Sequence, residues 1–272
     1  EIRVCDWSSD VCSSDLEIAG LDPDVVFLQE VDRNSKRSHG IDELDLIREA
    51  QSGYCDTFAN NYKVVYVPYP LPTIGKVDSG IVTLSKYEVK DSRRFALPCP
   101  FSYPIRTANL KRCLMIDRVP VEGSDKELVL VNLHLEAYDD GDGKAAQTQM
   151  LQEILQEEVN DGNYVIAGGD FNQAFSGVDT SMYPKISEDL WQLGEIDTDL
   201  FGEDFTLVTD NSAPSCRSLD QPYAGADHEK FQYYLIDGFI VSGNVTVESV
   251  ETQNLNFKNS DHNPILMKVT LD

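Results

Sequence analysis

Short apolar runs alternate with polar turns along most of the chain, a pattern typical of a protein with many buried strands. Alternating or continuous apolar positions predict strands at nine places, within residues 25–28, 63–67, 80–84, 114–121, 128–135, 164–167, 233–241, 245–250 and 265–271. Pro68, Pro70 and Pro72 mark a loop after the second run. The turn Gly123-Ser124-Asp125 predicts that the strands on either side of it pair.

Apolar residues recur at helical spacing in two segments, which predicts helices within residues 41–50 and 144–159. The second has its apolar stripe at Leu151, Ile154, Leu155 and Val159. Residues 206–230 contain Pro, Ser and Asp and are predicted to form a long loop. Since no linker or repeat divides the chain, we expect one α/β domain built on two packed sheets.

Composition narrows the class of protein. The 272 residues are 41% hydrophobic, enough to bury one large core. Lys and Arg total 22 against 47 Asp and Glu, a formal net charge of −25 that repels a polyanion at long range. Proteins that hold duplex DNA normally do so with Lys and Arg, so the balance disfavours a nucleic-acid partner. No apolar run approaches the ~20 residues of a membrane helix, so we expect no membrane span.

The first sixteen residues, EIRVCDWSSDVCSSDL, differ from the rest of the chain. They have no clear helical or strand period, and residues 6–16 match the translated end of a short-read sequencing-library adapter without a mismatch. We therefore predict that residues 1–16 are an artefactual or disordered tail that packs against nothing, and that 17–272 form the domain. With the true N-terminus missing, a signal peptide stays open, although we expect a cytoplasmic monomer.

Five short motifs that could carry chemistry each lie at or near the end of an apolar run. In order they are Leu28-Gln29-Glu30, Asn132-Leu133-His134, Gly169-Asp170-Phe171-Asn172, Ile236-Asp237-Gly238-Phe239 and Ser260-Asp261-His262-Asn263-Pro264. Polar groups at strand ends can converge on one cleft at the rim of a sheet. The motifs supply carboxylates for a hard metal ion, imidazoles and an amide for a phosphate, and a carboxylate to orient a histidine. That inventory suits metal-assisted cleavage of a phosphate ester.

Each motif also has a purely structural interpretation. Glu30, beside Asp32, fits a solvated surface, and His134 in its apolar alternation fits a buried structural histidine. Asp170 and Asn172 fit a turn with side-chain-to-backbone hydrogen bonds. Asp237 is different, because a carboxylate inside an apolar run is costly to bury without a partner.

Taken together, LDPDVVFLQEVD, NLHLE, GGDFN, IDGFIVS and SDHNP resemble the endonuclease/exonuclease/phosphatase superfamily, the deoxyribonuclease-I-like hydrolases. The resemblance runs from about residue 17 to residue 271. It implies an α/β (α+β) fold, a four-layer sandwich of two packed mixed β-sheets flanked by helices. It also implies attack of water on phosphorus, dependent on Mg²⁺ with Mn²⁺ as an alternative ion.

The resemblance implies a role for each motif residue. Glu30 and Asp261 would be metal ligands, and Asp170 would activate or orient the attacking water. The other residues would act on the phosphate, with Asn172 and His134 on its oxygens, His262 on the developing negative charge, and Asp237 on the orientation of the His262 ring.

The chain departs from the family pattern at its start. The family begins with a strand that ends in an asparagine near the metal, whereas no asparagine precedes Asn34 here. We therefore predict that a core strand and one residue of the site are missing. Loss of an interior strand would leave backbone groups of its neighbours unpaired.

Three functions remain open for this scaffold. The first is a metal-dependent hydrolase, a phosphodiesterase or phosphomonoesterase, acting on a small or lipid-derived phosphate ester. The second is a deoxyribonuclease-I-like nuclease that uses a local basic cleft. The third is a binding module on the same scaffold without catalysis.

Overall fold

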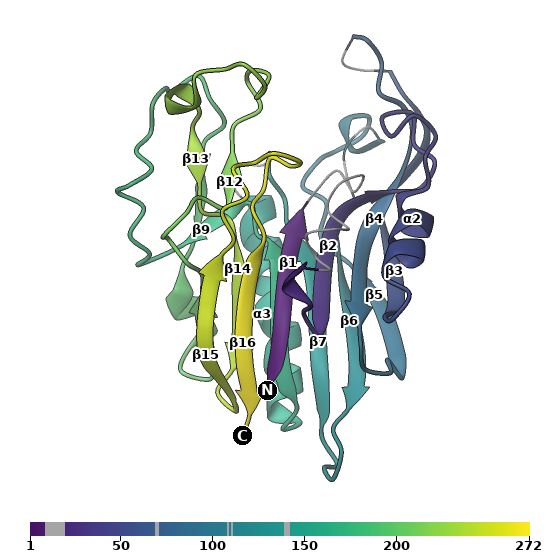
Figure 1. Ribbon diagram of the computed structural model, residues 1–272, viewed down its shortest axis with the longest axis vertical. Coiled ribbons are helices and arrows are strands. Elements are labelled where there is room, and N and C mark those ends of the chain that lie inside the picture. The colour runs from purple at the N-terminus through teal and green to yellow at the C-terminus, as the bar shows by residue number, and fades with distance from the viewer. Residues whose placement is uncertain (9–19, 69–70, 108, 110, 139–141) are drawn as a thin grey trace.

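The computed structural model describes residues 1–272 except 9–19, 69–70, 108, 110 and 139–141 (Figure 1). Within that part of the chain, two six-stranded sheets form the body of the molecule. The helix α2 (Glu43–Ala50) contacts one sheet and α3 (Asp142–Asn160) contacts the other. The α/β sandwich expected from the sequence is therefore confirmed.

The first sheet has the strand order β15-β16-β1-β2-β4-β3. Its strands span β1 (Ile2–Ser8), β2 (Val25–Asp32), β3 (Cys55–Val67), β4 (Gly75–Ser85), β15 (Val245–Thr252) and β16 (Ile265–Leu271). The pair β1 and β2 is parallel, and the other neighbours are antiparallel.

The second sheet has the order β11-β14-β8-β7-β6-β5. Its strands span β5 (Asp91–Ala96), β6 (Cys113–Pro120), β7 (Glu127–His134), β8 (Tyr164–Asp170), β11 (Phe205–Val208) and β14 (Asp237–Ser242). Short elements complete the described part: β9 (Gln173–Phe175), β10 (Gly194–Ile196), β12 (Cys216–Arg217), β13 (Tyr233–Tyr234) and the 3-10 helices η2 (Ile105–Thr107), η3 (Thr198–Phe201) and η4 (His228–Lys230).

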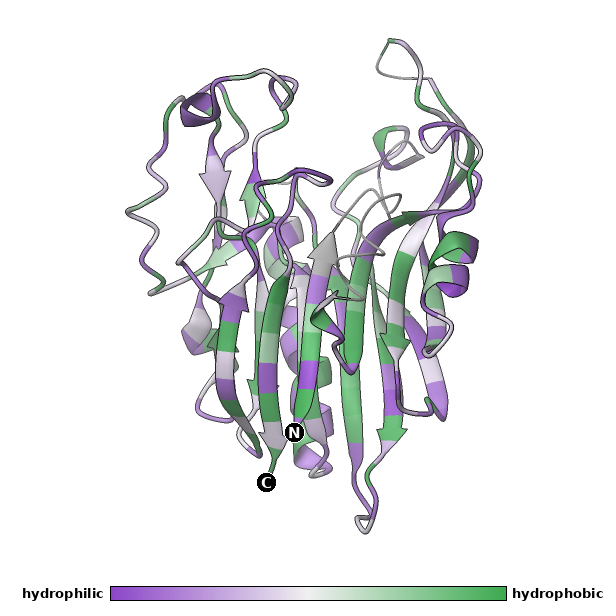
Figure 2. Cartoon of the chain, in the orientation of Figure 1, coloured by the Kyte–Doolittle hydropathy of each residue, from purple (hydrophilic) through white to green (hydrophobic). Residues whose placement is uncertain are grey.

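Apolar side chains fill three layers between these elements. Phe27 and Met267 of the first sheet pack with Ile166 and Phe239 of the second. The outer layers lie under the helices, where Ile47 of α2 is fully buried with its neighbours on the first sheet. Figure 2 shows hydrophobic stretches along the strands and more hydrophilic loops. Burial of this apolar surface supplies the main driving force for folding.

The N-terminal segment contradicts the sequence-based expectation. Residues Ile2–Ser8 form β1, a central strand between β16 and β2, in which Val4 and Cys5 are fully buried. The prediction that these residues pack against nothing is therefore wrong, and the strand position expected to be vacant is occupied. Pairing on both edges and burial on both faces stabilise a strand whose own sequence shows little periodicity. Residues 9–16 lie outside the described residues, and the adapter origin of the segment stays a prediction.

Most other predicted elements are confirmed, and several extend further than their sequence pattern. Two predictions fail in part. The supposed loop 206–230 contains β12 and most of β11, because short strands form here by pairing with distant partners. The supposed single strand 233–241 is split, since β13 pairs with β12 while β14 pairs with β8 and β11. In the described part of the chain, no helix has the length and apolar character required to cross a membrane.

Strand register brings the sequence motifs to one edge of the sandwich, meaning the edge formed by the ends of the strands and not by an outermost strand. In the second sheet, Asp170 at the end of β8 lies opposite both His134 on β7 and Asp237 on β14. In the first sheet, Gln29 lies opposite Ser8, and Asp6 lies opposite Ile265 at the start of β16. Gln29 Nε2 donates to Asn132 Oδ1 across the sandwich at 3.1 Å, which ties the two sheets together at this edge. Both chain termini lie at the opposite edge (Figure 1).

Gly169 is required where β8 passes β7. Its φ is +145°, and a Cβ at this position would lie 2.0 Å from the carbonyl oxygen of Leu133. Because that oxygen belongs to a paired strand, Gly169→Ala should lower the free energy of unfolding by about 3 kcal/mol or more. Urea denaturation measures it.

Gly177→Ala is the matched control, since Gly177 also has a positive φ, +81°, but has open space around it. Its cost should be about 1 kcal/mol, the conformational penalty alone. Equal losses in the two variants would contradict the steric argument.

Asp117 is a buried carboxyl group whose ionisation should destabilise the fold. Its Oδ2 accepts a hydrogen bond from Thr57 Oγ1 at 2.9 Å, while its buried Oδ1 has no partner among the described residues. Burial raises the pKa of Asp117 above its ordinary value. The unfolded carboxyl ionises at the ordinary pKa, so this group lowers stability as the pH rises from that value through the raised one.

We therefore expect Asp117→Asn to increase the free energy of unfolding by about 1 kcal/mol at pH 7. The gain should vanish at a pH below the ordinary pKa, where the wild-type carboxyl is protonated in both states. Urea denaturation at the two pH values tests this prediction. A loss of stability at pH 7 would show that Ser92, Thr83 and Thr57, which act to lower the pKa of Asp117, stabilise the carboxylate more than burial disfavours it.

Candidate active site

Two buried acid–histidine pairs lie at the edge formed by the strand ends. His134 Nε2 is 3.3 Å from Asp170 Oδ2, and His262 Nδ1 is 2.9 Å from Asp237 Oδ2. The two pairs adjoin, since potential ligand atoms of Asp170, Asp237 and His262 all lie within 4.8 Å of one another. The structure thus brings together four of the residues singled out in the sequence, although they come from three motifs in one sheet and one that precedes β16.

Asp237 begins β14, and its backbone amide donates to Ser215 Oγ at 3.3 Å. Its carboxylate contacts His262 Nδ1 through both oxygens, at 3.0 and 2.9 Å. Burial opposes a charge on His262, but the Asp237 carboxylate outweighs it and raises the pKa of His262 well above its ordinary value. Burial also raises the pKa of Asp237. The pair therefore retains a shared proton at neutral pH, which we place on His262.

Asp170 and Asn172 are held by the turn that follows β8. Asp170 Oδ1 accepts the Asn172 backbone amide at 2.7 Å, and Oδ2 accepts Asn172 Nδ2 at 3.1 Å. Asn172 has φ +51°, a conformation that asparagine tolerates better than most residues. Phe171 between them is fully buried and packs edge-on against Phe175, which anchors the turn. Asp170 and Asn172 can therefore form a hydrogen-bonded turn and belong to the site at the same time.

Asp170 is an ionised carboxylate despite its burial. Burial acts to raise the pKa of Asp170, but the hydrogen bond from His134 and the charges of His134 and His262 outweigh it, so the pKa lies below the ordinary value. His134 Nδ1 is buried and has no hydrogen-bond partner in the part of the chain that the structure describes. His134 thus contacts the Asp170 carboxylate through Nε2 and keeps Nδ1 without a partner in this part of the chain.

Glu30 projects from an irregularity in β2. The register between β2 and β4 shifts between Leu28 and Val31, and Glu30 between them has φ +59°. Such bulges redirect a side chain and are frequent beside functional sites. The Glu30 side chain is 41% exposed and pairs with Arg37 at 3.1 Å.

The electrostatic surroundings keep Glu30 charged. Partial removal of the Glu30 carboxyl from water acts to raise its pKa, but the charges of Arg37, His134 and Arg112 outweigh this effect and lower it. Arg37 also holds Asp32 through two hydrogen bonds, at 2.7 and 3.0 Å. The guanidinium therefore fixes the Glu30 carboxylate in an ionised state at the edge of the site.

Asp261 lies on the same edge, directly before His262. Its carbonyl accepts the Arg217 backbone amide at 3.0 Å, and its side chain is partly exposed. Glu30 is on β2, Asp261 precedes β16, and the single strand β1 lies between these two strands. The backbones of β2 and β16 are therefore about 10 Å apart. A hard cation takes oxygen ligands and keeps several waters, so each of these two carboxylates has the chemistry of a possible ligand.

Three residues of this region lie outside the seven to which the sequence assigned a role in the site. Gln29 bridges Asp6 Oδ1, at 2.8 Å, and Asn132 at the base of the site. Arg37 pairs with Glu30. Arg112 is 3% exposed, and its Nε and Nη1 have no partner among the described residues. Gln29 and Asn132 belong to the LQE and NLH motifs, so a sequence signal for their place in the site existed. Arg37 had no such signal, because its position depends on how a loop folds.

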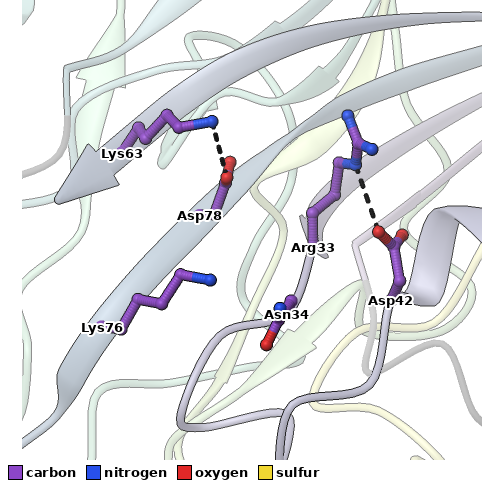
Figure 3. A pocket seen from close by; sticks show the side chains of 6 residues that line it. All are labelled: Arg33, Asn34, Asp42, Lys63, Lys76 and Asp78. Atoms are coloured by element: carbon purple, nitrogen blue, oxygen red, sulfur yellow. Dashed lines mark hydrogen bonds and ion pairs between the residues drawn. The ribbon is translucent and has the colours of Figure 1, made fainter. Parts of the chain in front are cut away.

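A pocket of about 210 Å³ has none of the acid–histidine residues in its lining (Figure 3). It is lined by Arg33, Asn34, Asp42, Lys63, Lys76 and Asp78. Two of the cations are neutralised, because Lys63 is 2.8 Å from Asp78 and Arg33 is 3.4 Å from Asp42. The acid–histidine pairs, and not this polar hollow, carry the features expected of a reactive site.

A two-sheet sandwich with acid–histidine pairs at one edge is the arrangement expected of a hydrolase. Comparison with known families points to the same class of protein. The model of the Endonuclease/Exonuclease/phosphatase family matches residues 15–262. The chain belongs to this family, whose members generally hydrolyse phosphoester bonds. No curated protein matches the chain in sequence.

Solved structures show the same fold at low sequence identity. An endonuclease/exonuclease/phosphatase from Beutenbergia cavernae is 20% identical, with a TM-score of 0.68 over 99% of this chain and 71% of that one. One from Bacteroides vulgatus is 18% identical, with a TM-score of 0.64 over 100% and 99%. The human Nocturnin catalytic domain with bound sulfate anion is 15% identical, with a TM-score of 0.62 over 100% and 94%.

Proposed function

We propose that this protein is a divalent-metal-dependent hydrolase of phosphate esters on a small or lipid-derived substrate. The observation that carries the proposal is that two neighbouring side chains are held in opposite charge states. Asp170 is held as a carboxylate, while His262 beside it is held as a cation by Asp237. Neighbouring groups whose pKa values are pushed apart are the usual basis of acid–base chemistry in one site.

Glu30 and Asp261 would hold the metal ion. They fit a hard cation because both are accessible carboxylates on one edge and Glu30 is kept ionised, although Arg37 would share the Glu30 carboxylate. When bound, Mg²⁺ or Mn²⁺ supplies a Lewis acid that neutralises charge on the phosphate. The binding-module alternative requires no such arrangement of ionised groups.

The remaining residues would act on water and phosphate. Asp170 would orient a water molecule and accept its proton, while Asn172 Nδ2 holds Asp170 Oδ2 in place at 3.1 Å. His134 would donate to a phosphate oxygen. His262 would face the negative charge that develops on phosphate oxygens as water attacks. Preorganised positive groups of this kind lower the barrier most where water is excluded, as the burial of His262 provides.

The charge distribution supports a small substrate over a polynucleotide. The net charge is −25. Arg37, a cation at the site, is already engaged by Glu30 and Asp32. A strand of DNA would meet few free cations along its backbone, whereas a single phosphate needs only the groups at the site itself.

Hydrolysis of bis-p-nitrophenyl phosphate tests this proposal. We expect the purified chain to release p-nitrophenolate with Mg²⁺ or Mn²⁺ and to lose that activity in excess chelator, with recovery when the ion is returned. Activity on duplex DNA at matched salt should be lower. Efficient nicking of DNA would instead support the nuclease alternative. A folded, metal-loaded protein that hydrolyses no phosphoester would overturn the proposal in favour of a binding module.

A further inference from the structure

Cys216 lies directly against the reactive histidine. It begins β12 and forms an isolated antiparallel bridge with His262. Two backbone hydrogen bonds fix this bridge, from the Arg217 amide to the Asp261 carbonyl at 3.0 Å and from the Asn263 amide to the Ser215 carbonyl at 2.8 Å. The thiol is therefore held beside the His262 side chain by the backbone.

These residues make a second set of potential metal donors. Cys216 Sγ, a carboxylate oxygen of Asp261 and a ring nitrogen of His262 all lie within 4.8 Å of one another. One sulfur, one nitrogen and one oxygen suit Zn²⁺ and related thiophilic ions, which take three protein ligands and a water in a tetrahedron. Mg²⁺ takes oxygen ligands, so this donor set selects a different class of ion from the Glu30 carboxylate.

Two residues of the site are buried, and the third is accessible to solvent. Cys216 and His262 are each 7% exposed, while Asp261 is partly exposed and offers a route for an ion. Burial raises the pKa of the Cys216 thiol to about 12, so the free protein holds it as S–H. A thiophilic ion would displace that proton, and the proton on the ligating nitrogen of His262, into solvent.

We propose that Cys216, Asp261 and His262 form a binding site for a thiophilic divalent ion such as Zn²⁺, and that its occupation stops hydrolysis. Inhibition follows because the ion would take a ring nitrogen of His262 and the Asp261 carboxylate, two groups that the proposed hydrolysis uses. Binding stands on the geometry of the three residues alone, while inhibition also rests on the hydrolytic function proposed above. The two parts are therefore tested separately.

Co²⁺ in place of Zn²⁺ tests binding without any measurement of activity. A thiolate ligand gives Co²⁺ a sulfur-to-metal charge-transfer band in the near ultraviolet, so the chain should show this band at one equivalent. Cys216→Ser should abolish the band and weaken Zn²⁺ binding at least ~10-fold, as loss of a coordinating group does. Cys55→Ser is the matched control, because Cys55 is an exposed thiol away from His262 and its loss should leave the band intact.

Circular dichroism and thermal unfolding first establish that each variant folds, with Cys216→Ala as a second choice if the serine variant does not. An undiminished band in a folded Cys216 variant, or no band in the unaltered chain, would overturn the site. Loss of the band in Cys55→Ser alone would assign the ion to a surface thiol and would also overturn it.

Zn²⁺ titration at saturating Mg²⁺ tests the inhibition. The unaltered chain should lose hydrolysis as Zn²⁺ is added, whereas Cys216→Ser should need at least ~10-fold more Zn²⁺ for the same fractional loss, each protein being compared with its own rate without Zn²⁺. Equal sensitivity of the two proteins would overturn the inhibition while the Co²⁺ band still decides the site. If no phosphoester is hydrolysed at all, the proposed function fails, and the Co²⁺ result still stands or falls separately.

Discussion

Asp170→Asn is expected to lower the turnover of bis-p-nitrophenyl phosphate by ~10²- to 10⁴-fold, because an amide cannot accept a proton from water. The substitution conserves shape, and the Asn172 backbone amide can still donate to the side-chain oxygen at position 170, as it does at 2.7 Å to Asp170. The lost group is an ionised carboxylate whose pKa is kept low, against the effect of burial, by His134 and His262. The new amide nitrogen would face Asn172 Nδ2 and His134 Nε2 where Asp170 Oδ2 accepted, so circular dichroism and thermal unfolding first establish that the variant folds. Steady-state kinetics at saturating Mg²⁺ then measures the loss of turnover.

Asp117→Asn is the matched control, since it makes the same change at another buried aspartate of the second sheet. Asp117 pairs with Leu130 in the middle of the β6–β7 ladder, away from the edge where His134 ends β7. Its loss should leave turnover unchanged and stabilise the fold. A similar fall in turnover in both variants would indicate a general disturbance of the sheet. Full activity in Asp170→Asn would remove Asp170 from the chemistry.

Whether the place of a residue in the site could be predicted from the sequence depends on where that residue lies relative to its strand. Glu30 and Asp170 lie at or next to strand ends that short apolar patterns already predict, so their convergence on one edge could be expected, whereas Asp237 lay inside a predicted strand, 233–241, that the structure splits. The direct contact of His262 with Asp237 joins a segment before β16 to the second sheet. The family resemblance implied that contact, whereas spacing along the sequence does not give it, because it depends on how the two sheets are packed.

Other parts were not predictable because they arise from backbone irregularity or from long-range pairing. The bulge at Glu30, with its positive φ, has no signal in a run that reads as a regular strand. Arg37 reaches Glu30 and Asp32 only through the loop after β2. Cys216 is a buried free thiol, and its place opposite His262 comes from a bridge between two otherwise irregular segments.

The N-terminal strand shows the opposite error, in which an accurate observation about sequence led to a wrong statement about structure. The match to an adapter gave no reason to expect contacts, yet β1 lies between two partner strands with Val4 fully buried. Any short segment with enough β-branched and apolar residues can fill a strand position whose two neighbours offer unpaired backbone groups. The origin of a segment and its packing are separate questions.

Val4→Asp is expected to prevent folding or to lower the free energy of unfolding by more than ~4 kcal/mol, the size associated with an unpaired charge in a core. Val4 is 0% exposed and packs with Phe27 and Met267 between the sheets. Val65→Asp is the matched control, because Val65 on β3 is 88% exposed, and the same change there should alter stability by no more than about 0.5 kcal/mol. Urea denaturation followed by circular dichroism measures both. If Val4→Asp is as harmless as Val65→Asp, residues 1–8 do not occupy the core, and the interpretation of the segment as an unpacked tail is restored.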